Sequence, residues 1–198
     1  GFAPIISALA DLKLGGVPCF FMHGNRDFLI GKRFATATGC RLLAENEVIE
    51  IEGDRILLTH GDLLCTDDKP YMALRAVVRD PAWQREFLAK SLDERHAFAN
   101  QARQQSQSAI ADKSSQIMDV NQNEVLQLLK STQQTTVIHG HTHRPAIHQI
   151  QLDSPIAEHS EARRIVLGDW DQQGWFAELN PDGVSLQNFP LQTALASK

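Results

Sequence analysis

Three short apolar runs in the sequence each end on a histidine that is followed at once by glycine. The runs are residues 17–22 before His23-Gly24, residues 56–59 before His60-Gly61, and residues 136–138 before His139-Gly140. Such runs are typical of buried strands, and ligands of open α/β sheets bind outside the carboxyl ends of the strands. Glycine permits a sharp turn and a close approach to the backbone. The repeat therefore predicts a sheet that presents a site at one edge.

The third run continues as Gly140-His141-Thr142-His143. Two histidines separated by one residue point to the same side of an extended segment, so both imidazoles can serve one metal centre. A single strand-end histidine is more often a hydrogen-bonded structural residue, but His60-Gly61-Asp62 and residues 24–27 follow comparable strands. Asn25 adds an amide oxygen, and Mn²⁺ accepts mixed nitrogen and oxygen donors, whereas structural zinc prefers thiolates. The pattern favours a metal site.

Composition and charge narrow the class of protein. A chain of 198 residues can bury one sizeable core. The net charge of −5 does not favour a nucleic-acid-binding protein, so we expect no nucleic-acid partner. No run approaches the roughly 20 apolar residues that span a bilayer. The three cysteines form no C-x-x-C pair, which predicts neither a disulfide framework nor a zinc–cysteine site and fits a reducing, cytoplasmic setting.

The order of the predicted elements divides the chain into three parts. Residues 1–68 and 130–198 are predicted to form a core, and residues 69–129, rich in Ala, Gln, Arg and Glu, a helical insertion. The core is predicted from the following segments: helices over 4–14 and 30–38, a strand over 17–22, a hairpin over 47–59 that turns at Gly53-Asp54, and strands over 146–152, 164–167, 174–179 and 184–189.

Three motifs occur in a fixed order: Gly-Asn-Arg-Asp at 24–27, His-Gly-Asp at 60–62 and Gly-His-Thr-His at 140–143. They resemble the calcineurin-like metallophosphoesterases. The resemblance implies an α+β fold, a four-layer α/β/β/α sandwich, with a helical insertion and a dinuclear centre at the strand ends. Arg26 stands where most of that family has histidine. Together with residues 64–68, 117–123 and 139–145, it resembles the branch that hydrolyses UDP-2,3-diacylglucosamine in lipid A biosynthesis.

The resemblance also implies roles for individual residues. Asn25, His60 and His141 would hold one Mn²⁺, and His143 would be a ligand of a second; Asn25, Arg26 and His141 would be catalytic. The implied substrate contacts are Asn25, Arg26, Asp68, Arg103, Ser106, Lys113 and His141. A solvated helix face is the alternative for Arg103, Ser106 and Lys113, and Ile110 stands where the family has Asn. His139 is expected to be structural or to support the ligands.

The resemblance implies further expectations about partners and setting. The enzyme would use two Mn²⁺ ions and sit peripherally on the cytoplasmic face of the inner membrane, with no protein partner predicted. The insertion would cap the site and line an acyl-chain groove with side chains such as Trp83 and Phe87; the alternative is that these only pack the helices together.

The sequence departs from the family at its start. The family begins with Asp-x-His and then Gly-Asp, which supply three metal ligands, and neither motif precedes Asn25 in this sequence. The chain is therefore expected to be a fragment of a complete enzyme, or else a truncated product, and to hydrolyse poorly alone. A generic phosphodiesterase and a non-catalytic scaffold remain alternatives.

Overall fold

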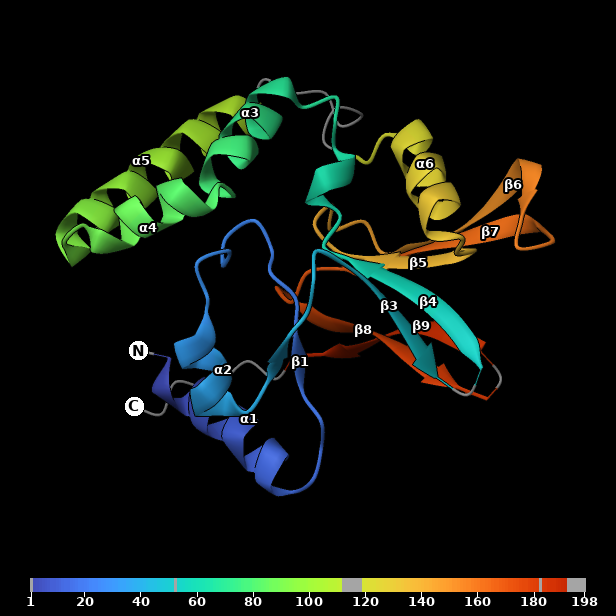
Figure 1. Cartoon of the computed structure of the whole chain (residues 1–198), viewed down its shortest axis with the longest axis horizontal. Coiled ribbons are helices and arrows are strands. Elements are labelled where there is room, and N and C mark those ends of the chain that lie inside the picture. Colours follow the sequence, from blue (N-terminus) through green and yellow to red (C-terminus); the bar gives the residue numbers. More distant parts are fainter. Residues whose placement is uncertain (1, 52, 112–118, 182, 192–198) are drawn as a thin grey trace. The chain divides into compact units, whose positions relative to one another are not determined.

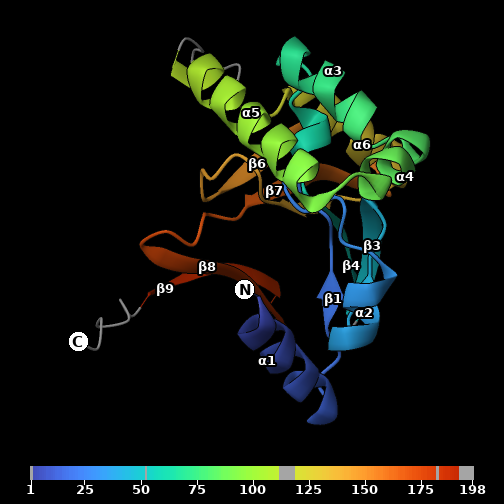
Figure 2. The same ribbon diagram turned by 90° about the vertical axis from the view of Figure 1, so that its left-hand side faces the viewer.

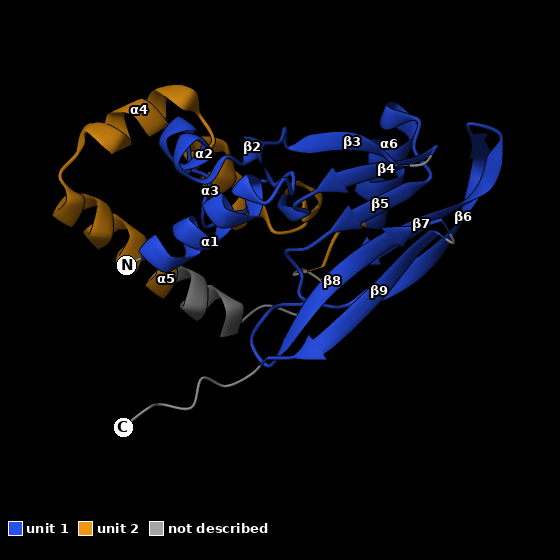
Figure 3. Ribbon diagram, turned by 90° about the horizontal axis from the view of Figure 1, so that it is seen from below, with its two compact units in different colours: residues 1–62, 122–198 blue, residues 63–121 orange. Residues whose placement is uncertain are grey.

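The computed structural model describes residues 2–51, 53–111, 119–181 and 183–191. Its contacts form two compact units, unit 1 within residues 1–62 and 122–198 and unit 2 within residues 63–121 (Figure 3). The insertion was predicted over 69–129, but helix α6 (Gln122–Thr132) belongs to unit 1. Val125 and Leu129 of α6 are buried. The apolar face of an amphipathic helix predicts that the helix packs against the protein, but it does not predict against which unit.

Unit 1 is built on a five-stranded mixed sheet in the order β3-β4-β5-β7-β6. Its strands are β3 (Asn46–Ile51), β4 (Asp54–Thr59), β5 (Thr136–His139), β6 (Ala146–Ile156) and β7 (His159–Val166). The central strands β4, β5 and β7 are parallel, and the outer strands β3 and β6 are antiparallel to their neighbours. The predicted hairpin between β3 and β4 is confirmed, and Gly53 takes the positive φ that its turn requires.

Apolar side chains cover both faces of this sheet. On one face, Ile56, Ile138 and Ile165 form a buried cluster against strands β8 (Gln173–Asn180) and β9 (Gly183–Pro190). Alternating residues point to the opposite face, where Leu57 and Val137 are fully buried and where α6 lies (Figure 1). The α+β class is thus confirmed, with a helix layer and two strand layers; the complete four-layer sandwich stays a prediction.

Residues 2–42 contribute two helices and two short strands to unit 1. These are α1 (Ala3–Leu14), β1 (Phe20–Phe21) and α2 (Lys32–Thr38), which Figure 2 labels, and β2 (Arg41–Leu42). Strand β1 pairs with β2 in parallel. Both predicted helices are confirmed, and α2 ends at Gly39 in the left-handed region. The strand predicted over 17–22 is shorter, because Pro18 has no N–H for a ladder and Val17 is exposed.

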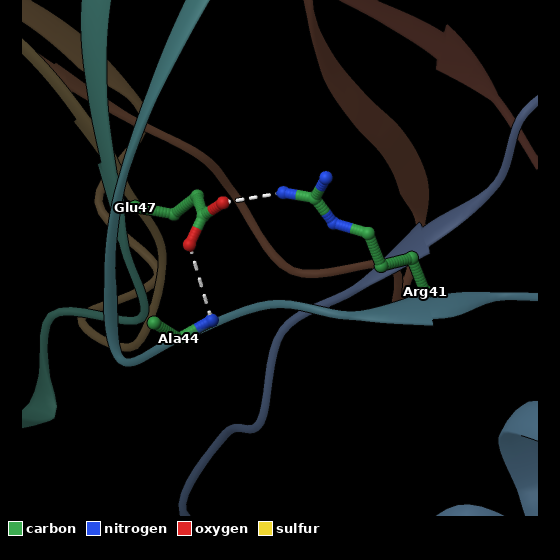
Figure 4. A network of polar contacts seen from close by, with 3 residues as sticks. All are labelled: Arg41, Ala44 and Glu47. Carbon is green, nitrogen blue, oxygen red and sulfur yellow. Dashed lines mark hydrogen bonds and ion pairs between the residues drawn. The ribbon is translucent and has the colours of Figure 1, made fainter.

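A polar contact joins β2 to the start of β3 (Figure 4). Arg41 Nη2 lies 2.5 Å from Glu47 Oε1, and the Ala44 N–H donates to the other carboxylate oxygen at 3.3 Å. The Arg41 guanidinium also lies over the ring of Phe20, 5.3 Å from its centroid. Because the Arg41 side chain is 65% exposed, this pair orders the connection and contributes little to stability.

Unit 2 consists of α3 (Lys69–Val78), α4 (Pro81–Ala89) and α5 (Leu92–Ala111). Asp68 and Asp80 cap α3 and α4 by accepting the backbone N–H groups of Tyr71 and Trp83. Asn121 ties the two ends of the unit together: its N–H donates to Leu64 O at 2.8 Å, and its amide donates to the Asp67 carboxylate at 3.1 Å.

The aromatic side chains of unit 2 pack on one another. Trp83 stacks on Phe87 at 4.7 Å between ring centroids, and Phe98 of α5 contacts both rings. Phe87 is buried. These contacts agree with the alternative that the side chains pack the helices together, and the acyl-chain groove stays a prediction. Among the described residues, no helix combines the length and the apolar character needed to cross a membrane.

Candidate metal centre

The carboxyl ends of the three parallel strands meet at one edge of the sheet. Thr59, His139 and Val166 lie level in the register of β4, β5 and β7. His60 directly follows β4, and the Gly140–His143 loop directly follows β5. The ends of β4 and β5 therefore lie side by side, and His60 and the Gly140–His143 loop are close together, as the sequence predicted.

His60 and His141 lie side by side. Their ring centroids are 5.1 Å apart in an edge-to-face arrangement, and both residues are half-buried. The Gly140 N–H donates to the His60 carbonyl at 3.1 Å, which fastens the two loops to each other. A ligand nitrogen lies about 2.1 Å from a first-row metal ion and about 1.1 Å from its own ring centre, so two imidazoles on one ion have centres roughly 5 Å apart. The separation of the His60 and His141 ring centroids matches this spacing.

The loop that carries Asn25 and Arg26 passes against the His60 ring. A Cβ placed on Gly24 would lie 2.9 Å from Cε1 of His60, so only glycine permits this approach. The loop is closed by the Gly24 N–H, which donates to Asp27 Oδ1 at 2.5 Å, and by His23 Nε2, which donates to the Ile30 carbonyl at 2.6 Å. His23 is thus a structural residue of the loop. Asn25 is half-buried and Arg26 is exposed.

His143 has a different neighbour. Its Nδ1 lies 3.5 Å from Asp169 Oδ2, and both side chains are at least half exposed. Sequence reasoning missed Asp169, although Gly168-Asp169 follows the buried end of a strand as the histidine motifs do. Among the described residues, no three His, Cys, Asp or Glu side chains are grouped to hold an ion. The structure thus places His60 beside His141, and both Mn²⁺ ions stay predictions.

The remaining predicted contacts lie in unit 2. Asp68 is half-buried at the start of α3, and its carboxylate already accepts the Tyr71 N–H at 3.1 Å. Arg103 is exposed on α5. Lys113 and the side chains of Ser106 and Ile110 lie outside the described part of the chain. Their predicted substrate roles stay predictions.

The chain is similar to curated proteins over nearly its whole length, although no protein-family model matches it. It is 47% identical over 188 residues to the UDP-2,3-diacylglucosamine hydrolases of Escherichia coli (strain K12 / DH10B) and Pectobacterium carotovorum. The similarity to the hydrolase of the same name from Klebsiella pneumoniae is 46% over 186 residues. These alignments cover 94–95% of this chain and 75–76% of the relatives, so the chain spans about three quarters of their length.

Proposed function

Because this chain belongs to the UDP-2,3-diacylglucosamine hydrolase family, we propose that it hydrolyses the pyrophosphate bond of UDP-2,3-diacylglucosamine in lipid A biosynthesis. The products are UMP and 2,3-diacylglucosamine 1-phosphate. Identity of 47% over 95% of the chain carries this proposal. The adjacent His60 and His141 rings, at the strand edge where the motifs predicted a metal, support it.

The proposed ligands of one Mn²⁺ are His60, His141 and Asn25, with His143 as a ligand of a second ion. Imidazole nitrogen and amide oxygen together suit a borderline ion. When bound, Mn²⁺ supplies Lewis acidity towards phosphoryl oxygens and lowers the pKa of water. The close approach of Gly24 to the His60 ring and the hydrogen bond from the Gly140 N–H to the His60 carbonyl support the placement of these residues.

Arg26 is the proposed phosphate-binding residue of the loop. Its exposed guanidinium offers a planar fork of donors for two phosphate oxygens. In the proposed reaction, water oxygen bonds to the α-phosphorus and the bond from that phosphorus to the bridging oxygen breaks. The sugar phosphate leaves with the bridging oxygen, and UMP keeps the new oxygen. Asn25 and His141 would hold the α-phosphate beside Arg26, and Asp68, Arg103, Ser106 and Lys113 would contact the rest of the substrate.

Exposed apolar side chains of unit 2 are the proposed contacts of the acyl chains. Leu74 and Val77 of α3 are 43% and 49% exposed, and their spacing of three places them on one helix face. Trp83 and Phe87 stack on each other, so we assign the acyl contact to the exposed side chains of α3. Peripheral association with the cytoplasmic face of the inner membrane would follow from a substrate that resides there.

The decisive experiment compares two substrates in Mn²⁺. Turnover of UDP-2,3-diacylglucosamine above that of bis-p-nitrophenyl phosphate supports the proposal, and the reverse order identifies a generic phosphodiesterase. Less than one Mn²⁺ per chain even in the full-length protein, measured by mass spectrometry, identifies a scaffold.

The acyl contact is tested separately with the double variant Leu74→Ser/Val77→Ser. We expect the KM for the acylated substrate to rise while hydrolysis of the soluble phosphodiester is kept. The matched control is Arg85→Ser, an exposed position on α4. Equal losses for both substrates in the double variant would disprove the acyl contact.

A further inference from the structure

A buried pair of polar side chains lies directly behind the candidate metal centre. His139, the last residue of β5, is 1% exposed, and Arg164 of β7 is 3% exposed. Arg164 Nη1 lies 3.3 Å from His139 Nε2. Arg164 is level with Val137 in the register, so its side chain reaches along the sheet to a residue two positions further on in β5. A guanidinium is costly to bury, so a buried one is normally paired or hydrogen-bonded.

The chemistry of the partners fixes the proton on His139. A guanidinium can only donate hydrogen bonds, so the Nε2 that faces Arg164 accepts one. His139 Nδ1 lies 2.9 Å from the carbonyl oxygen of Gly140, which can only accept, so Nδ1 carries the proton and donates it. His139 is therefore the neutral Nδ1–H tautomer, and the contact with Arg164 selects the tautomer that can hold Gly140.

The Gly140 carbonyl joins this pair to the loop of His141. It accepts the His139 Nδ1–H on one side and the Thr142 N–H, at 2.8 Å, on the other, while the Gly140 N–H donates to the His60 carbonyl. The next residue, His141, has φ of +65°. A side chain with a Cβ rarely adopts this left-handed conformation unless its surroundings impose it. The fixed Gly140 peptide is such a constraint.

His139 also contacts the loop of His60. Gly61 has φ of +103°, and a Cβ on it would lie 2.7 Å from His139 Nδ1, so the backbone of this loop packs directly on the ring. The His139 ring thus touches the loops that carry both histidines of the candidate centre.

We propose that Arg164 and His139 are positioning residues: Arg164 selects the tautomer of His139, and His139 holds the Gly140 peptide so that His141 is kept beside His60. The role of this positioning in metal binding rests on the proposed function. The hydrogen bonds that link Arg164, His139 and Gly140 do not depend on it.

The first test needs no metal and no substrate. Long-range ¹⁵N–¹H NMR of the wild-type chain is expected to show His139 protonated on Nδ1; protonation on Nε2 would overturn the proposal. Amide hydrogen exchange then measures how strongly the backbone of the Gly140–His143 loop is held. In Arg164→Met, the protection of the Gly140 and Thr142 amides is expected to fall about tenfold. The control is Arg163→Met on the opposite face of β7, where protection should be unchanged. Equal protection in both variants would contradict the inference.

The second test measures Mn²⁺ affinity by electron paramagnetic resonance. We expect Kd to rise about tenfold in Arg164→Met, as for other residues that orient metal ligands, and to recover in part in Arg164→Lys, which keeps a cationic donor. Unchanged affinity in Arg164→Met overturns the proposal. A wild-type chain that binds no Mn²⁺ but shows the Nδ1 tautomer counts against the proposed function, not against the hydrogen-bond chain. If Arg164→Met does not fold, the proposal is still tested by the His139 tautomer of the wild type and by the Mn²⁺ affinity of Arg164→Lys.

Discussion

Single glycines at the strand ends decide how closely the loops approach the histidine rings. We predict that Gly24→Ala lowers Mn²⁺ affinity about tenfold, because the new Cβ would lie 2.9 Å from Cε1 of His60 and push the ring aside. Gly24 does not need a positive φ, so alanine is tolerated by the backbone and the free energy of unfolding should change little. Titration with Mn²⁺ and urea unfolding measure the two effects.

The matched control for this substitution is Gly31→Ala. A Cβ there would meet no atom within 4 Å, and its φ is also not positive. Equal Mn²⁺ affinity in the two alanine variants would show that the Gly24 contact does not position His60.

Residue-level prediction from the sequence worked where a pattern has a physical cause. The His-Gly strand endings predicted that His60 and the loop of His141 would meet, and they do. Asp169 was missed because a lone carboxylate after a strand is common, and its nearness to His143 depends on the arrangement of β5 and β7. The buried pairing of His139 with Arg164 was missed for the same reason, since it depends on strand register.

At the scale of elements, the start of α5 carries a pH-dependent cap. The Ser91 hydroxyl and then the Ser91 N–H donate to the Glu94 carboxylate, at 2.7 and 2.9 Å, and lower the pKa of Glu94 from its ordinary value. Because the folded pKa is lowered, the cap contributes fully above the unfolded pKa of about 4.3 and is lost as pH falls through the folded value.

We predict that Ser91→Ala raises the pKa of Glu94 back towards its ordinary value and increases amide exchange in the first turn of α5. Carboxyl NMR titration of the wild type and the variant measures the shift. In Glu94→Gln, exchange in the same turn should no longer respond to acid. A Glu94 pKa that is the same with and without Ser91 would rule out this cap.

The sequence predicted the hairpin and the two N-terminal helices well, but it predicted the length of β1 and the unit to which α6 belongs less well. The β3–β4 hairpin, α1 and α2 follow from local signals such as Gly53 and Gly39. Pro18 is a local signal that limits the start of β1, but the end of β1 depends on a partner strand of two residues, which is not local in sequence. The place of α6 in unit 1 depends on what Val125 and Leu129 pack against.

At the scale of the whole molecule, each of the two units has buried apolar side chains. We predict that Phe87→Ala lowers the free energy of opening of unit 2 by roughly 3–5 kcal/mol, because it leaves a cavity beside Trp83 and Phe98. Hydrogen exchange should accelerate in α3 and α4 and stay unchanged in β4, β5 and β7.

The reciprocal variant is Leu129→Ala in α6, where the side chain is fully buried. It should destabilise unit 1 by roughly 2–5 kcal/mol and leave exchange in α4 as it was. Matching acceleration in both units, for either variant, would show that the molecule opens as one cooperative body instead.

The hydrogen bonds of Asn121 to Leu64 and Asp67 also bear on the order of folding. The parallel pairing of β4 with β5 closes a loop that contains all of unit 2, and the entropic cost of closing a loop rises with the length of flexible chain in it. Once unit 2 has folded, Asn121 holds its entry and exit together, and the flexible chain left to close is short. Early folding of unit 2 would therefore speed the step that brings His60 and His141 together.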